Sequence, residues 1–234
     1  LIAQSQYDEA IKAYDEAIRL DPGYATAWNN KGIALKKWGK YEEAVRAYDE
    51  AIRLDPDYAA AWNNKGIALK SQANYYEAIK AYDQAIRLDA NSSDARYNRG
   101  NVLMSLNRFD EAVLAYDQAI SLDANSSDAW YNKGNALKSI GKYDEAILAY
   151  DEVIRLDPSY ADAWQKKAAA LSAIGRYDES TLAFNEALNI SNRKGDSTTN
   201  DGSSEEIDGS STGISVSYKG PGSDRGEETD SGAI

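Results

Sequence analysis

The stretch ATAWNNKGIALKKWGKYEEAVRAYDEAIRLDPDY, residues 25–58, is followed directly by the near copy AAAWNNKGIALKSQANYYEAIKAYDQAIRLDANS at residues 59–92. The period is 34 residues, and a fixed period of this length is typical of stacked supersecondary units. The full units are residues 25–58, 59–92, 93–126, 127–160 and 161–194, of which the last is the most degenerate. We also predict a partial unit over residues 1–24, holding only a second helix, and an acidic, Gly/Ser-rich, disordered tail over residues 195–234.

Each unit has the pattern of two helices. Apolar residues recur at helical spacing, as Trp28 and Leu35 do in the first half of a unit and Tyr41 and Tyr48 do in the second. Gly39 lies between the halves, where the chain must turn. Some units end in Asp-Pro, a helix stop, and two end in Asp-Ala-Asn-Ser-Ser, whose serine can cap the next helix. The sequence therefore predicts a series of antiparallel helix pairs.

These fixed positions resemble the tetratricopeptide repeat. In the unit 25–58 the family's pattern is carried by Trp28, Gly32, Leu35, Tyr41, Ala44, Tyr48, Ala51 and Pro56. The departures are local: Arg96 replaces a tryptophan, Ala168 a glycine and Ser180 an alanine. The resemblance implies an all-α fold, an α-solenoid in which helix pairs form a right-handed superhelix, and a role in protein–protein interaction.

Composition argues against an enzyme. The 234 residues include no His and no Cys, and the net charge is −12. The chain therefore lacks the residues for a thiol nucleophile, an imidazole base or a Cys-ligated metal. Asp-Glu pairs recur at the period at the start of second helices, as Asp110/Glu111, Asp144/Glu145 and Asp178/Glu179, where negative charge favours the helix dipole. We expect no catalytic residue, no metal and no cofactor, and the acidic balance disfavours nucleic acid and membrane as partners.

The resemblance also indicates where a ligand would bind, because in this family positions 2, 5, 6, 9, 12 and 13 of the first helix face a concave groove. Position 6 is held by Asn30, Asn64, Asn98 and Asn132, and then by Lys166. An asparagine amide can pair with a peptide group, so a row of them could hold an extended chain. This row is similar to the asparagine ladder of O-linked N-acetylglucosamine transferase. Asparagine is also common at position 6 whether or not a ligand binds there, and that alternative stays open.

Other groove positions vary between units. The remaining candidate peptide-binding residues are Tyr97, Tyr131, Asn101, Asn135, Lys36 and Lys70. They suggest an apolar and lysine-containing stretch in residues 25–92, and a Tyr/Asn/Asp stretch in residues 93–194. The two tyrosines are candidates for rigid anchors, whereas a solvated face is the alternative for the lysines. A carboxylate clamp is disfavoured because Asp162 stands where that site needs a cation.

We interpret the chain as a protein-interaction scaffold that binds a peptide segment of a partner protein in the concave groove. One alternative is self-association through repeat ends that lack a capping helix. A second is the recognition module of a larger enzyme such as a glycosyltransferase. The unpaired second helix at the start predicts that the native chain extends upstream or that this end meets another molecule. We expect a cytoplasmic location, although the N-terminus looks incomplete and could have lost a signal.

Overall fold

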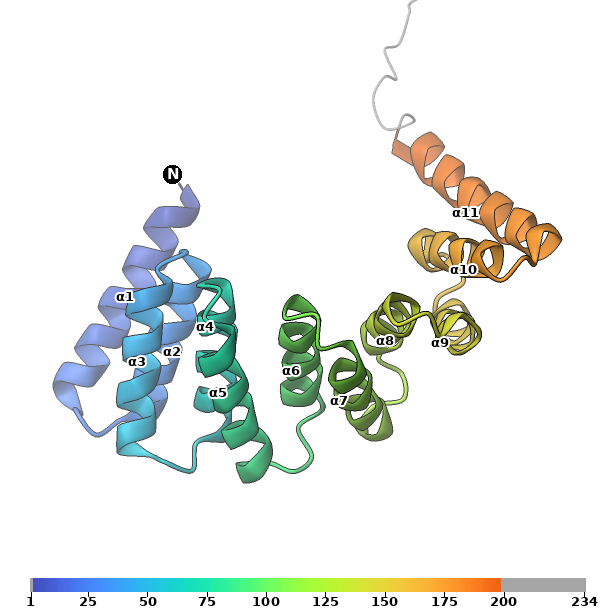
Figure 1. Ribbon diagram of the computed structural model, residues 1–234. Helices are drawn as coiled ribbons and strands as arrows, with labels where there is room; N and C mark the ends of the chain where they lie inside the picture. Colours follow the sequence, from blue (N-terminus) through green and yellow to red (C-terminus); the bar gives the residue numbers. More distant parts are fainter. Residues whose placement is uncertain (1, 199–234) are drawn as a thin grey trace, which may run out of the picture.

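The computed structural model describes residues 2–198, which form helices joined by short turns (Figure 1). The helices are α1 (Ile2–Leu20), α2 (Ala25–Lys37), α3 (Tyr41–Leu54), α4 (Ala59–Ser71), α5 (Tyr75–Leu88), α6 (Ser93–Ser105), α7 (Phe109–Leu122), α8 (Ser127–Ser139), α9 (Tyr143–Leu156), α10 (Ala161–Ala173) and α11 (Tyr177–Thr198). Each full unit is one helix pair, so the predicted all-α solenoid is confirmed.

The array is curved, and its two kinds of helix lie on different sides of the curve (Figure 1). The first helices of the units are α2, α4, α6, α8 and α10, and the others are second helices. First helices of neighbouring units contact each other, whereas within the described residues no second helix contacts another second helix. First helices are therefore closer together and line the inner, concave side.

Local signals set the helix ends as predicted. Ser92 and Ser126 accept hydrogen bonds from the backbone N–H groups of Ala95 and Ala129, at 3.3 and 3.4 Å, and so cap α6 and α8. Gly39 has a φ of 84°, in the left-handed region that favours glycine. Most second helices begin with acidic residues in the first turn, which stabilise the positive end of the helix dipole.

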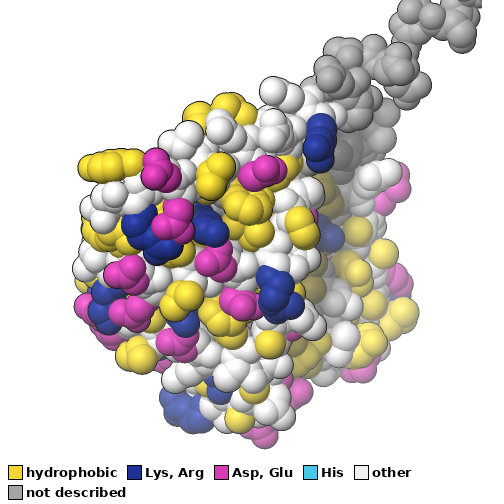
Figure 2. Space-filling view, turned by 90° about the vertical axis from the view of Figure 1, so that its right-hand side faces the viewer, with side chains coloured by type: hydrophobic (Ala, Val, Ile, Leu, Met, Phe, Trp, Pro, Cys, Tyr) yellow, Lys and Arg dark blue, Asp and Glu magenta, His cyan; other side chains and the backbone are white. Residues whose placement is uncertain are grey.

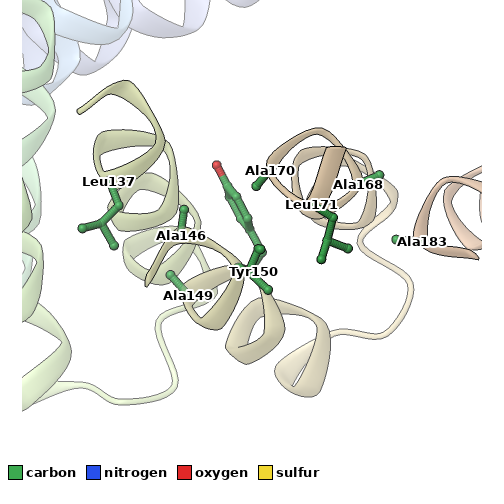
Figure 3. Close-up of a cluster of buried hydrophobic side chains, with 9 residues drawn as sticks. Leu137, Ala146, Ala149, Tyr150, Ala168, Ala170, Leu171 and Ala183 are labelled. Atoms are coloured by element: carbon green, nitrogen blue, oxygen red, sulfur yellow. The ribbon is translucent and has the colours of Figure 1, made fainter. Parts of the chain in front are cut away.

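The core of each unit is built around a tyrosine at position 24 of the repeat. Tyr48, Tyr82, Tyr116 and Tyr150 are fully buried. In Figure 3 Tyr150 projects from α9 and lies among side chains of α8, α9 and α10, including Leu137 and Ala170. A Cβ added to Gly134 would lie 2.6 Å from Cε1 of Tyr150, and the other three units show the same 2.6 Å distance. Glycine at position 8 is therefore required by the buried tyrosine ring.

Ion pairs tie each unit to the next. They join a cation at position 7 of one first helix to an aspartate at position 25 of the preceding second helix, 2.6–2.7 Å apart. The pairs are Lys31–Asp15, Lys65–Asp49, Arg99–Asp83, Lys133–Asp117 and Lys167–Asp151. The four lysines also lie over tryptophan rings, with Nζ 5.0–5.4 Å from the ring centroid. These links fix the register of the stack.

Two helices are longer than the repeat pattern predicts. α1 begins at Ile2, five residues before the predicted start at Tyr7, and α11 continues through Thr198, past the predicted end of the last unit at residue 194. The rest of the predicted tail lies outside the described residues. Phe184 and Leu188 on α11 are 49 and 42% exposed, as expected where no further helix among the described residues covers them. Leu182 was expected to be uncovered for the same reason, but its 67% exposure has another cause, because Leu114 and Leu148 at the same repeat position are 61 and 66% exposed in units that a further helix follows. Figure 2 shows the face at this end, where hydrophobic side chains are interspersed with acidic and basic ones.

Candidate functional site

The position-6 asparagines are half-buried on the first helices, and Asn64, Asn98 and Asn132 each bridge to the preceding unit. The side-chain amide of Asn64 donates to Asn29 Oδ1 at 3.0 Å, and that of Asn98 donates to Asn63 Oδ1 at 3.3 Å. The amide of Asn132 donates to the Tyr97 hydroxyl, at 3.1 Å, and also to Asn101 Oδ1 at 3.1 Å. The row of asparagines therefore holds neighbouring first helices together, a role that the sequence analysis did not foresee.

These bonds leave part of each amide free. Among the described residues nothing donates to the Oδ1 atoms of Asn64, Asn98 and Asn132. Asn64 and Asn98 each use one of their two side-chain N–H groups in the inter-unit bond. Each therefore has one N–H donor and its Oδ1 acceptor left for a ligand. The ends of the row differ. Asn30 Oδ1 accepts a long bond of 3.4 Å from Asn29, and half-buried Lys166 replaces asparagine in the last unit.

Asn101 and Asn135 lie on the first-helix face and also form hydrogen bonds with tyrosines of the core. They accept hydrogen bonds from the buried hydroxyls of Tyr116 and Tyr150, at 2.8 and 2.9 Å. In the two earlier units isoleucine occupies the same position 9. There the buried hydroxyls of Tyr48 and Tyr82 have no hydrogen-bond partner in the described structure. Position 9 thus decides whether the hydroxyl of the core tyrosine has a hydrogen-bond acceptor. Asn101 Oδ1 also accepts from Asn132 and has both lone pairs in use, whereas Asn135 Oδ1 accepts one bond within the described residues and keeps one lone pair for a ligand.

Tyr97 and Tyr131 are held by other aromatic rings. Tyr97 lies 6.0 Å from Tyr116 and Tyr131 lies 6.1 Å from Tyr150, measured between ring centroids. Tyr131 also contacts Tyr160 at 5.3 Å, a residue that the sequence analysis did not include. Burial, followed by the nearby Asp162 carboxylate, raises the pKa of Tyr131. Packed tyrosines with partly exposed rings lose little side-chain entropy when they bind a ligand.

The two halves of the first-helix face differ in charge. In the first half Lys36 and Lys70 are half-buried, and burial lowers the pKa of Lys36, with the neighbouring Lys37 adding to the effect. In the second half a small cavity is lined by Tyr97 together with Asp94, Asp123 and Asp128. Lys138 and Lys166 are also half-buried on first helices of the second half, so the added aspartates, and not a lack of lysines, distinguish the second stretch. A larger hollow lies beside Trp28 and Arg46, away from the asparagine row.

Two classes of site are not seen in the described part of the chain. Among residues 2–198 no group of His, Cys, Asp and Glu side chains is arranged to hold a metal ion. Within the same residues no helix has both the length and the apolar character needed to cross a membrane.

Family comparisons agree with the helix pairs. Models described as tetratricopeptide repeat match residues 25–58, 59–92 and 127–160, and also 81–113 and 149–181. A model described as TPR repeat matches residues 1–39 and 100–141. The chain therefore belongs to the tetratricopeptide repeat family, a family of protein-interaction scaffolds. A comparison with curated proteins gives no match.

Solved structures show the same architecture. The crystal structure of MamA is 27% identical, with a TM-score of 0.68, and the match covers 70% of this chain and 96% of MamA. YrrB, whose structure is described as a TPR protein with an unusual peptide-binding site, is 26% identical, with a TM-score of 0.67 and coverage of 77% and 93%. The C-terminal part of a TPR protein from Cytophaga hutchinsonii has a TM-score of 0.72 over 82% of this chain and 77% of its own, and at 17% identity it shares only the fold.

Proposed function

We propose that this chain binds a peptide segment of a partner protein along the concave face of its first helices. The observation that carries the proposal is the free donor and acceptor that Asn64 and Asn98 keep after their inter-unit bonds. A peptide group presents the complementary acceptor and donor. YrrB, which resembles this chain over most of its length, is described as having a peptide-binding site, and this supports the same use here.

The spacing of the row suits an extended ligand. Packed helices lie about 8–10 Å apart, and neighbouring first helices are in contact. An extended chain advances about 3.3 Å per residue, so successive asparagines would meet backbone groups about three residues apart. Backbone pairing of this kind tolerates many ligand sequences. Preference for particular ligand side chains would come from Tyr97 and Tyr131 as anchors and from the charges of Lys36, Lys70 and Lys166. The side-chain amide groups of Asn101 and Asn135 that are not used in hydrogen bonds within the array would also contribute.

A selected peptide tests the proposal. A random 12-residue peptide library is panned against the whole chain, and the enriched peptide is labelled for fluorescence anisotropy. The double variant Asn64→Ala/Asn98→Ala should weaken binding about tenfold or more, because two buried backbone pairings are lost. An enriched peptide that binds this variant as tightly as the wild type would exclude the asparagine row as the site.

Asn29→Ala is the matched control for Asn64→Ala. Both variants break the same 3.0 Å hydrogen bond, but Asn29 is only 4% exposed and cannot reach a ligand. The two variants should therefore lose similar stability on urea unfolding, while only Asn64→Ala loses affinity. Equal losses of affinity would mean that the asparagine acts on binding only through the stack.

A further inference from the structure

A second candidate surface lies on the outer side of the array, at position 22 of the repeat. This position is on the side of the second helix opposite its buried residues, and six successive second helices present it to solvent. In the first three it is basic, as Lys12, Arg46 and Lys80, and in the last three it is leucine, as Leu114, Leu148 and Leu182. We call these last three residues the leucine row. Their exposed fractions are 61, 66 and 67%.

Single exposed leucines are ordinary, but here one repeat position changes from a basic residue to leucine in three successive units. The basic residues at this position fit the water-facing role well: Lys12 Nζ forms an ion pair with Asp8 Oδ2 at 2.6 Å. The corresponding aspartates of the later units are Asp110, Asp144 and Asp178, one turn before each leucine. Leucine replaces the cation in all three, so an exposed apolar side chain lies one turn after an exposed carboxylate.

The carboxylates beside the leucine row stay available. All three aspartates are exposed, and within the described residues none forms an ion pair. Their neighbours Glu111 and Glu145 are instead paired with the preceding Arg108 and Lys142. A partner that meets the leucine row would therefore gain by bringing apolar side chains flanked by cations.

We propose that the outer face of α7, α9 and α11 binds an amphipathic helix of a partner protein, through the leucine row and its three aspartates. The partner helix would carry an apolar stripe bordered by Lys or Arg. Among the described residues second helices do not contact each other, so neighbouring leucines are more than about 10 Å apart. A helix that reaches all three needs at least about 14 residues, at 1.5 Å per residue.

Charge disfavours other occupants. A second copy docking through the same row would set aspartate against aspartate. An anionic membrane would be repelled by the carboxylates and by the net charge of −12. A cationic helix meets neither obstacle, and its site is separate from the concave groove of the proposed function.

The test uses a synthetic 18-residue helical peptide with one leucine stripe flanked by lysines, and a second peptide with glutamate in place of every lysine. Binding to the whole chain is followed by fluorescence anisotropy at physiological ionic strength. The charge-neutral variant Leu114→Gln/Leu148→Gln/Leu182→Gln should bind the lysine peptide about tenfold more weakly than the wild type. The glutamate peptide should not bind measurably to either protein.

Two further variants separate the contributions. Asp110→Asn/Asp144→Asn/Asp178→Asn should weaken binding several-fold and flatten its dependence on salt. The matched control Lys12→Gln/Arg46→Gln/Lys80→Gln alters the same repeat position in the other half, and should not weaken binding. All variants should melt within a few degrees of the wild type, because these side chains are exposed.

Three results would overturn the proposal. The first is unchanged binding of the lysine peptide to the triple leucine variant. The second is a wild-type dimer in sedimentation that becomes a monomer in that variant, which would assign the row to self-association. The third is binding of wild type, but not of the variant, to phosphatidylserine vesicles, which would assign it to a lipid surface.

Discussion

Gly134→Val should lower the free energy of unfolding by about 3 kcal/mol, an overpacking cost at the upper end of the usual range. The added Cβ would lie 2.6 Å from Cε1 of Tyr150 and 2.9 Å from its Cδ1 and Cζ. That ring is fully buried between helices of two neighbouring units, so it has no open space to move into (Figure 3). Urea unfolding followed by circular dichroism measures the loss.

Ala169→Val supplies the control for that experiment. Ala169 lies on a first helix, as Gly134 does, but its side chain is exposed. Valine there should cost less than about 1 kcal/mol, which is the difference in helix propensity alone. If the two variants lose the same stability, the contact between glycine and tyrosine does not govern the packing of the unit.

Tyr82→Phe and Tyr116→Phe should change stability in opposite directions. The Tyr82 hydroxyl is buried and has no hydrogen-bond partner among the residues that the structure describes, so removing it should raise the free energy of unfolding by about 1 kcal/mol. The Tyr116 hydroxyl donates to Asn101 Oδ1 at 2.8 Å, so removing it should lower the free energy of unfolding by about 1–2 kcal/mol. Both variants make the same substitution at position 24 of the repeat, and the residue at position 9 is isoleucine in one unit and asparagine in the other. The difference between them therefore measures the effect of position 9.

The partner position can be tested directly. Ile67→Asn places beside Tyr82 the residue that accepts the Tyr116 hydroxyl in the next unit. In this background Tyr82→Phe should become destabilising. A loss of equal size for Tyr82→Phe and Tyr116→Phe in the wild-type background would show that both hydroxyls are satisfied to the same degree in solution.

The repeat period predicted most of the fold. Helix pairs, the turn at Gly39 and the caps at Ser92 and Ser126 follow from local chemistry, which a sequence displays directly. The two extended end helices were not predicted, because no turn signal marks their limits. Glycine at position 8 was recognised from the family pattern, and the structure supplies its physical reason in the buried tyrosine ring.

The bonds between units were not predicted, although a signal for some of them was present. Lys65 and Asp49 are 16 residues apart, a spacing that only the docking of one helix pair on the next brings together. The recurrence of the same charges in five units could have indicated the pairing. The bond from Asn64 to Asn29 is harder to find, because an asparagine gives no sign in the sequence of whether its partner is the next helix or a ligand.

The central claim is that a peptide lies along the concave row of asparagines. It is tested most directly by titrating ¹⁵N-labelled protein with the library-selected peptide and following the asparagine side-chain amides by NMR. We predict that the side-chain amide signals of Asn64 and Asn98 shift, and that the dissociation constant fitted from these shifts equals the one measured by anisotropy. The backbone amide signals of Leu114 and Leu148 on the outer face should stay unchanged. Shifts on the outer face with unchanged Asn64 and Asn98 amides would contradict the account.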